Sequence, residues 1–168
     1  MDSQERNTGF RIDPATGQDA AAIQRMIRGL ADYERLSHMV VSTEESLRSA
    51  LFGSRPVAEA IVARAGADAV GFALFFHTYS TFAGRPGMYL EDLYVEPQWR
   101  GRGLGRGLLA RVARIAAERG CDRLGWSVLD WNEPALGFYR SLGAELVQDW
   151  VGYRLSGEPF RRLAETGD

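Results

Sequence analysis

A short stretch rich in glycine and arginine, residues 100–105, does most to restrict how this chain can fold. It follows an apolar run at residues 88–95 and precedes residues 104–119, where apolar side chains recur at helical spacing. Three glycines within these six residues allow a tight turn and a close approach of the backbone to another molecule. The sequence therefore predicts a strand that passes through a glycine-rich turn directly into a helix.

The rest of the chain supplies further strands and helices around this joint. Alternating or continuous apolar runs predict strands, and apolar residues at helical spacing predict helices. The expected strands are residues 10–12, 57–65, 69–79, 88–95, 124–129 and 150–155. The expected helices are residues 16–33, 42–53, 104–119 and 134–142, with a loop at 80–87 and a terminal turn at 160–164. Strands interleaved with helices indicate an α/β fold, a central mixed sheet flanked by helices.

The 168 residues fit one domain of ordinary size. We expect residues 1–9 to form a flexible tail and residues 10–168 a single domain. The sequence contains no run of 18 apolar residues, and its one cysteine, Cys121, suits a reducing compartment, so we expect a cytoplasmic protein. Two histidines and one cysteine show no metal-ligand spacing, so no metal is predicted.

The distribution of charge separates one segment from the rest of the chain. All 20 basic residues are arginine, and against 22 acidic residues they give a net charge of −2. Residues 97–123 hold seven arginines and two acidic residues, so this segment carries +5 and the remainder −7. A basic segment within an acidic chain indicates an anionic ligand there and a cationic ligand elsewhere. The basic segment is too short, and the chain too balanced, for a nucleic-acid-binding protein.

The glycine-rich turn has the features of a pyrophosphate-binding loop. The free N–H groups and the dipole of the following helix attract anions, and Arg100, Arg102 and Arg106 add positive charge. The alternative interpretation is a glycine-rich turn with solvated arginines. A P-loop requires lysine, which the chain lacks. A dinucleotide-binding motif, G-x-G-x-x-A at residues 105–110, is disfavoured because its glycines fall inside the predicted helix.

Residues 95–105 resemble the acetyl-CoA loop of the GNAT N-acetyltransferases, whose pattern Q/R-x-x-G-x-G/A runs from Arg100 to Gly105. Residues 28–34, residues 89–95 and parts of 131–144 are similar to the diamine (spermidine/spermine-type) branch of that family. The resemblance covers about residues 10–164. It implies a mixed sheet splayed into a V, coenzyme A in the cleft, and a homodimer.

The resemblance also implies two catalytic residues. An amine acceptor arrives as ammonium, so a base must remove its proton before it attacks a thioester. Glu91 is expected on the strand face shared by Tyr89, Leu93 and Val95, and it matches the family's base. Tyr139 matches the general acid that protonates the leaving thiolate. The alternatives are an arginine-paired carboxylate for Glu91 and a core aromatic residue for Tyr139.

Further residues match the binding positions of the family. The cofactor-binding positions are Leu93, Tyr94, Val95, Arg100, Gly101, Arg102, Gly103, Leu104, Gly105, Arg106, Asn132, Pro134, Ala135 and Tyr139. The acceptor-binding positions are Tyr33, Glu34, Glu91, Asp92 and Trp150. Asp92 is expected on the strand face opposite Glu91, and Asn132 also suits a helix N-cap. A further acidic position of the family falls on Gln148 or Asp149.

Together these residues predict an acetyl-CoA-dependent N-acetyltransferase that acts on a primary amine by direct attack in a ternary complex. A diamine or polyamine is the expected acceptor, because Glu34, Glu91 and Asp92 would form an acidic channel. The alternative acceptor is an amino acid such as thialysine or lysine, whose carboxylate an arginine in the pocket would favour. A different class of function is a non-catalytic sensor that binds coenzyme A, and the matches at Glu91 and Tyr139 argue against it.

Overall fold

The computed structural model describes residues 9–148 and 150–167. Its contacts divide the chain into two compact units, one ending at Leu129 and one beginning at Asp130. Residues 1–8 of the tail expected at residues 1–9 lie outside the described residues. The single domain expected over residues 10–168 stays a prediction.

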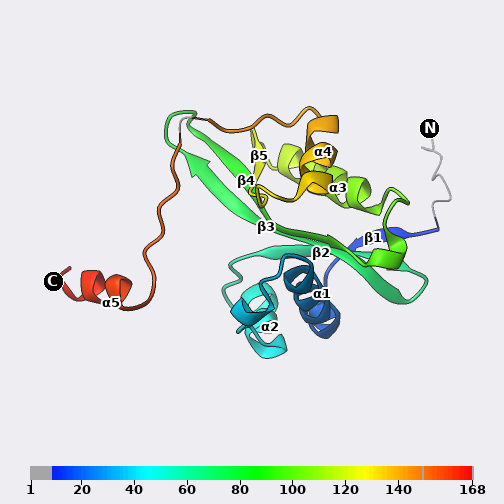
Figure 1. The fold of residues 1–168 in the computed structure, drawn as a ribbon, viewed down its shortest axis with the longest axis horizontal. Helices are drawn as coiled ribbons and strands as arrows, with labels where there is room; N and C mark the ends of the chain where they lie inside the picture. Colours follow the sequence, from blue (N-terminus) through cyan, green and yellow to red (C-terminus); the bar gives the residue numbers. More distant parts are fainter. Residues whose placement is uncertain (1–8, 149, 168) are drawn as a thin grey trace. The chain divides into compact units, whose positions relative to one another are not determined.

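The first unit is built on a five-stranded sheet with the strand order β1-β2-β3-β4-β5 (Figure 1). Strands β1 to β4 are antiparallel to their neighbours, and β5 pairs with β4 in parallel, so the sheet is mixed. The strands are β1 (Arg11–Pro14), β2 (Glu59–Ala65), β3 (Asp68–Ser80), β4 (Arg85–Val95) and β5 (Leu124–Trp126).

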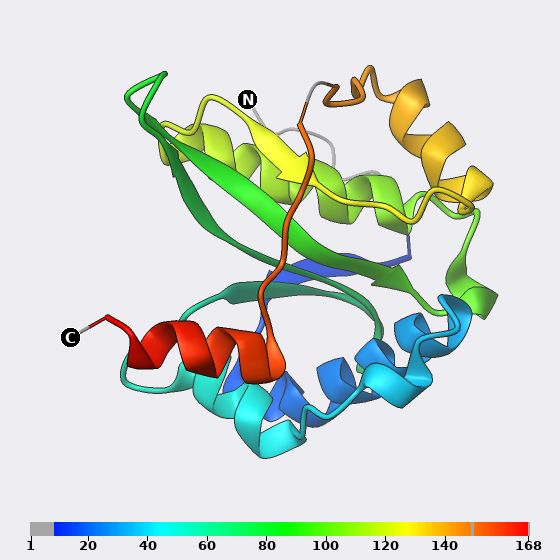
Figure 2. The same cartoon turned by 60° about the vertical axis from the view of Figure 1, so that its left-hand side comes forward.

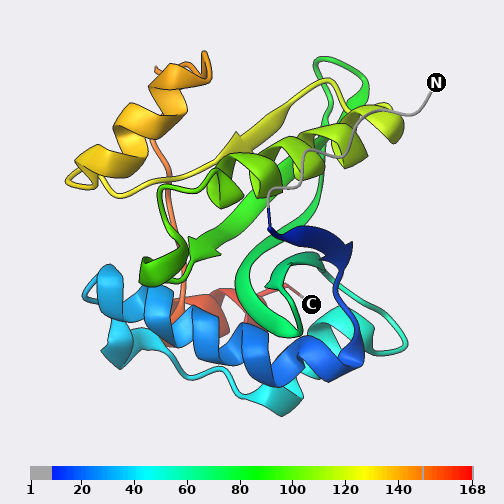
Figure 3. The same cartoon turned by 90° about the vertical axis from the view of Figure 1, so that its right-hand side faces the viewer.

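Helices cover both faces of this sheet (Figures 1 and 3). α1 (Ala20–Tyr33) and α2 (Glu44–Phe52) lie on one face, and α3 (Leu104–Glu118) lies on the other. Short 3-10 turns precede α1, follow α1 and follow β4; they are η1 (Gly17–Asp19), η2 (Ser37–Met39) and η3 (Pro97–Trp99). The predicted α/β fold, a central mixed sheet flanked by helices, is confirmed.

Each face of the sheet has its own apolar core. On one face α1 buries Ile23 and Met26 against Phe72 of β3, and each of these side chains contributes about 1.5–3 kcal/mol by leaving water. On the other face α3 packs closely over Gly71, where a Cβ would lie 3.3 Å from Leu108 Cδ1. The apolar residues that α3 buries are Leu104, Leu108, Leu109, Val112 and Ala116. β3 and β4 are therefore held between helices on both sides.

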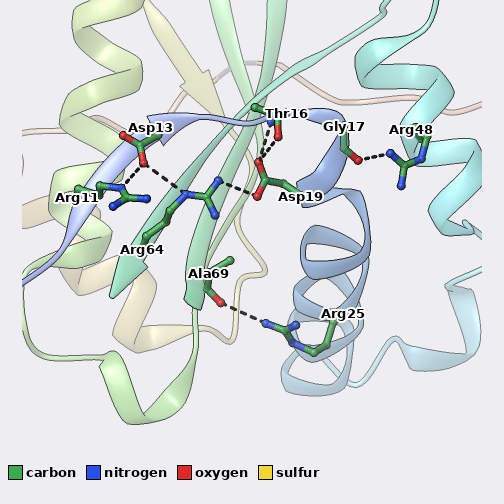
Figure 4. A network of polar contacts seen from close by, with 9 residues as sticks. All are labelled: Arg11, Asp13, Thr16, Gly17, Asp19, Arg25, Arg48, Arg64 and Ala69. Carbon is green, nitrogen blue, oxygen red and sulfur yellow. Dashed lines mark hydrogen bonds and ion pairs between the residues drawn. The ribbon is translucent and has the colours of Figure 1, made fainter. Parts of the chain in front are cut away.

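A polar network ties the start of α1 to the sheet (Figure 4). Thr16 and Asp19 form the predicted helix start, and the Asp19 carboxylate accepts hydrogen bonds from Thr16 N (2.8 Å) and Arg64 Nη2 (2.7 Å). Arg64 lies on β2 and also pairs with Asp13 of β1, Nε to Oδ2, at 3.4 Å. Burial raises the pKa of Asp19, but the hydrogen bonds from Thr16 and Arg64 outweigh it and hold that pKa below its usual value. α1 therefore begins at a fixed point on the sheet.

The described residues of the second unit form two helices. α4 (Glu133–Ser141) begins as predicted, because the Asn132 side chain accepts a hydrogen bond from Ala135 N (3.3 Å) and Pro134 lies in the first turn. α5 (Gly157–Glu165) is longer than the turn predicted at residues 160–164. The strand predicted at residues 150–155 is wrong, since these residues lie outside any helix or strand (Figure 2). A strand needs a neighbouring strand for its N–H and C=O groups, and the elements of this unit are helices.

Two boundaries within the first unit also differ from the prediction. The loop expected at residues 80–87 is a tight turn at residues 81–84, because β3 and β4 pair as far as Ser80 and Arg85. β5 ends at Trp126 rather than residue 129, since β4 pairs with it only over residues 88–90. Within residues 9–148 and 150–167, no helix is long and apolar enough to cross a bilayer.

Candidate active site

Strand β4 contains a bulge at Glu91. Across the β3–β4 ladder, Leu90 pairs with Phe75 and Asp92 pairs with Leu74, so Glu91 is the extra residue and has no partner on β3. A bulge bends its strand and redirects the side chains on either side of it. The Glu91 side chain is exposed, whereas Asp92 is half-buried.

The bulge changes which side chains share a face of β4. Tyr89, before the bulge, and Asp92, after it, pair with alternate residues of β3, so their side chains lie on the same face of the sheet. Leu93 and Val95 lie on the opposite face. The prediction that Glu91 shares its face with Tyr89, Leu93 and Val95 is therefore wrong. That prediction assumed uninterrupted alternation, which the extra residue breaks.

Beyond the bulge, β4 has a backbone edge that β5 does not cover. β5 pairs only with residues 88–90, whereas β4 continues to Val95. The N–H of Glu96 donates to the carbonyl of Val70 on β3 at 2.9 Å. Because backbone N–H groups alternate in direction along a strand, those of Leu93 and Val95 point away from β3. This arrangement suits the role expected for Leu93 and Val95, donation to a carbonyl oxygen of a ligand.

Two carboxylates, Glu34 of α1 and Glu91 of β4, act on a third, Asp92. Burial and the negative charges of Glu91 and Glu34 together raise the pKa of Asp92 to about 6. Glu34 is the C-cap of α1, and burial raises its pKa as well. Among the described residues, no ion pair includes any of the three, so the arginine partner considered for Glu91 is absent there. The cluster is therefore a concentration of negative charge suited to an ammonium group.

The end of α1 that carries Glu34 has a fixed backbone. The N–H of Leu36 donates to the carbonyl of Ala31, and the N–H of Arg35 donates to that of Asp32, which together form a Schellman motif. Arg35 holds the left-handed position of this motif with a φ of 61° and is the one described non-glycine residue with positive φ. Glycine normally takes this position, so α1 ends beside the acidic cluster in a strained conformation.

Arg100 lies against the same end of α1. Its Nε donates to the carbonyl of Val95 at 2.8 Å. The guanidinium carbon lies 5.0 Å from the centre of the Tyr33 ring and 5.4 Å from that of Tyr94. The structure therefore brings Tyr33, Tyr94 and the first residue of the glycine-rich loop together.

The glycine-rich loop turns as predicted into α3. Gly101 and Gly103 have φ values of 74° and 86°, which favour glycine, and Gly103 is the N-cap of α3 without a side-chain hydrogen bond. The first N–H groups of α3, from Leu104 onwards, have no partner within the helix and face the turn. These are the features of an anion site at a helix N-terminus.

The charged residues of this loop and of the first turn of α3 have different surroundings. The guanidinium carbon of Arg102 lies 4.8 Å from the centre of the Trp99 ring, and its side chain is exposed. Arg106, in the first turn of α3, is also exposed. Positive charge therefore surrounds the turn, as the pyrophosphate interpretation expects.

The remaining predicted site residues belong to the second unit. Asn132 is buried and caps α4, whose first turn contains Pro134 and Ala135. Tyr139 is half-buried on the same helix, with its ring centre 5.2 Å from that of Phe138. Trp150 is exposed, Gln148 is exposed, and Asp149 lies outside the described residues. The grouping of Tyr139, Asn132 and Trp150 with the residues of the first unit stays a prediction.

Two features of the site were not predicted from the sequence. The bulge at Glu91 depends on the register with β3, and the one local signal that could have indicated it is the pair of adjacent carboxylates within an apolar strand. The contact of Arg100 with two tyrosines joins the end of α1 to residues 94–100, and no local pattern indicates it.

Comparison with known proteins adds independent findings. Residues 26–144 match the Acetyltransferase (GNAT) family. The chain is 41% identical over 165 residues to a thialysine N-epsilon-acetyltransferase of Mus musculus, covering 92% of this chain and 96% of that protein. It is 30% identical over 198 residues to an L-ornithine N5-acetyltransferase of Arabidopsis thaliana, covering 91% and 87%. It is 31% identical to a spermidine/spermine N(1)-acetyltransferase-like protein of Homo sapiens, covering 92% of this chain and 24% of that protein.

Proposed function

Since this chain belongs to the GNAT acetyltransferase family and is an N-acetyltransferase, we propose that its acceptor is the side-chain amine of an amino acid such as thialysine, lysine or ornithine. The observation that carries this proposal is the 41% identity to a thialysine N-epsilon-acetyltransferase over nearly the whole of both chains. The sequence favours a diamine or polyamine, with the amino acid as the alternative. The comparisons support that alternative better than the polyamine.

Acetyl-CoA is the proposed acetyl donor, and the residues of the first unit fit it. The positive-φ turn of Gly101 and Gly103, with the first N–H groups of α3, suits the pyrophosphate. The N–H groups of Leu93 and Val95 suit the thioester carbonyl oxygen and the oxyanion that develops there. The resemblance also assigns Asn132, Pro134, Ala135 and Tyr139 to the cofactor, and we propose the same role for them.

The acidic cluster is proposed to hold the acceptor's ammonium group and to take its proton. An alkyl amine has a pKa of about 10, so at neutral pH only about one molecule in a thousand carries a free lone pair. Asp92, with a pKa raised to about 6, is a better match for a proton acceptor than an ordinary carboxylate. Glu91 is exposed on the bulge, so we propose that it helps to bind the ammonium while Asp92 is the base.

The proposed reaction proceeds by direct attack. Asp92 removes a proton from the acceptor nitrogen, and the nitrogen lone pair then forms a bond to the thioester carbon. The tetrahedral intermediate collapses as the C–S bond breaks, and the coenzyme A thiolate takes a proton from the Tyr139 hydroxyl. The acetylated nitrogen still carries one proton more than an amide, and it returns that proton to the Tyr139 phenolate. Tyr33 and Trp150 are proposed to contact the body of the acceptor, and the expected homodimer remains a prediction.

Turnover with a panel of amines tests the proposed acceptor. Thiol release from acetyl-CoA would be followed with thialysine, lysine, ornithine, putrescine and spermidine, and the position of the acetyl group would be found by mass spectrometry. We expect acetylation of the side-chain nitrogen of the amino acids, with kcat at least about 100-fold lower in Tyr139→Phe. Efficient turnover of spermidine or putrescine without turnover of the amino acids would contradict the proposal.

The pH dependence of kcat/KM separates the two carboxylates of β4. If Asp92 is the base, wild-type kcat/KM rises with an apparent pKa of about 6, and Asp92→Asn loses this limb of the profile. Glu91→Gln is the matched variant, and we expect it to raise KM while kcat/KM still rises with pH near 6. If instead only Glu91→Gln loses this rise, Glu91 rather than Asp92 is the base.

A further inference from the structure

An arginine of α1 holds the segment that joins β4 to the glycine-rich loop. Arg25 Nη2 donates to the carbonyl of Ala69 on β3 at 3.2 Å (Figure 4). The same nitrogen donates to carboxylate oxygen Oε1 of Glu96, the residue that follows β4, also at 3.2 Å. The other oxygen, Oε2, accepts a hydrogen bond from Gln98 Nε2 at 2.8 Å. Both oxygens of Glu96 are therefore used, one by α1 and one by the segment itself.

The backbone of Glu96 is attached at the same place. Its N–H donates to the carbonyl of Val70 at 2.9 Å, so Arg25 and Glu96 bond to successive residues of β3. Its carbonyl accepts a hydrogen bond from the N–H of Trp99 at 2.8 Å, which closes the turn η3. The Glu96 side chain is 20% exposed, against 60% for Arg25. The segment after β4 therefore starts from a point that α1 and β3 fix together.

Residues 96–100 separate two groups of hydrogen-bond donors that we assign to acetyl-CoA. The N–H groups at the end of β4, proposed to bind the thioester oxygen, are held by the pairing of β4 with β3. The turn of Gly101 and Gly103, proposed to bind the pyrophosphate, leads into α3, whose first residue, Leu104, is 1% exposed. Each group is thus fixed by its own element, and residues 96–100 set the distance between them. A ligand that binds both groups gains full affinity only when this distance matches its own length.

We propose that Arg25 is a positioning residue, which acts through Glu96 to set the spacing between the thioester-binding and pyrophosphate-binding groups. This inference rests on the proposed function, because it assumes that acetyl-CoA spans the end of β4 and the glycine-rich turn. Without the ion pair, residues 96–100 would have to be ordered when acetyl-CoA binds, which lowers its affinity. A partly exposed ion pair contributes little to global stability, so its loss should affect binding rather than folding.

Fragments of acetyl-CoA test this role, because each fragment occupies only one group of donors. S-acetylpantetheine carries the thioester without the pyrophosphate, and 3′-phosphoadenosine 5′-diphosphate carries the pyrophosphate without the thioester. Calorimetry without an acceptor amine would give the Kd of acetyl-CoA directly and that of each fragment by displacement of acetyl-CoA. Arg25→Gln should raise the Kd of acetyl-CoA by about 3- to 10-fold and leave the Kd of each fragment within about 2-fold.

A double-mutant cycle tests whether Arg25 acts through Glu96. Glu96→Gln should also raise the Kd of acetyl-CoA, and the double variant should bind no more weakly than the weaker single variant. Arg48→Gln is the matched control, because Arg48 of α2 likewise bonds a carboxylate, that of Glu44 at 2.6 Å, and a backbone carbonyl, that of Gly17. Neither partner of Arg48 belongs to β4 or to the glycine-rich loop, so all three Kd values should stay unchanged.

Three results would overturn the role of Arg25. The first is an unchanged Kd of acetyl-CoA in Arg25→Gln. The second is a rise in the Kd of either fragment as large as that for acetyl-CoA, because damage to one group of donors weakens its fragment too. The third is a double variant in which the two losses multiply. If 3′-phosphoadenosine 5′-diphosphate does not displace acetyl-CoA from the wild type, the proposed cofactor site is wrong instead, and the inference fails with it.

Discussion

Replacing Asp92 by asparagine should stabilise the folded protein at pH 8, although it removes the proposed base. The pKa of Asp92 rises from 3.8 to about 6 because of burial and the charges of Glu91 and Glu34. The folded state therefore binds this proton more tightly than the unfolded state does. Stability linked to Asp92 is greatest below pH 4 and is lost as the pH rises through about 6.

The size of the effect follows from this shift. About 2 pKa units at 1.36 kcal/mol each amount to about 3 kcal/mol, and solvent screening of a half-buried group lowers the expected value to about 1.5 kcal/mol. The unfolding free energy of Asp92→Asn should thus exceed that of wild type by about 1.5 kcal/mol at pH 8 and by only about 0.5–0.9 kcal/mol at pH 4.5. An increase of this size in a variant with reduced turnover would mark Asp92 as a residue kept for function.

Urea unfolding of both proteins at the two pH values measures this difference. Glu118→Gln is the control, because Glu118 is an exposed carboxylate at the end of α3 and its replacement should change stability by no more than about 0.5 kcal/mol. Equal stability of Asp92→Asn and wild type at pH 8 would refute the argument. So would a difference that is the same at pH 4.5.

Three further substitutions test other parts of the structure. Gly103→Asp places a side chain at a φ of 86° and a negative charge at the turn, so calorimetry should detect no acetyl-CoA binding. Gly29→Ala brings a Cβ to 2.6 Å from the Tyr94 hydroxyl and should lower the free energy of unfolding by about 1–3 kcal/mol. Arg35→Gly removes the strain of a non-glycine residue in the left-handed conformation at the end of α1. It should raise the free energy of unfolding, measured with urea, by about 1 kcal/mol.

The parts of the fold that the sequence predicts well depend on neighbours in the chain. The turn into α3 needs positive φ at Gly101 and Gly103, and glycine is the residue that adopts it readily. The starts of α1 and α4 follow from Thr16 with Asp19 and from Asn132, whose side chains bond to backbone N–H groups within three residues. Such interactions are visible in a short stretch of sequence.

The parts that it misses depend on pairing between distant segments. The bulge at Glu91 exists because ten residues of β4 are matched to β3 with one left over, and alternation along β4 alone gives no sign of it. Residues 150–155 have the composition of a strand, but composition does not supply the neighbouring strand that pairing requires. The direction of the Arg100 side chain depends in turn on where α1 and β4 bring Tyr33 and Tyr94.

One ratio shows whether this N-acetyltransferase acts on the side-chain amine of an amino acid, as we propose. We would measure wild-type kcat/KM at pH 8 for thialysine and for bis(2-aminoethyl) sulfide, which lacks only the carboxylate. We expect a ratio of at least about 10 in favour of thialysine, the contribution of one charge-assisted contact. A ratio of one or less would mean that the enzyme does not recognise the carboxylate and that its acceptor is not an amino acid.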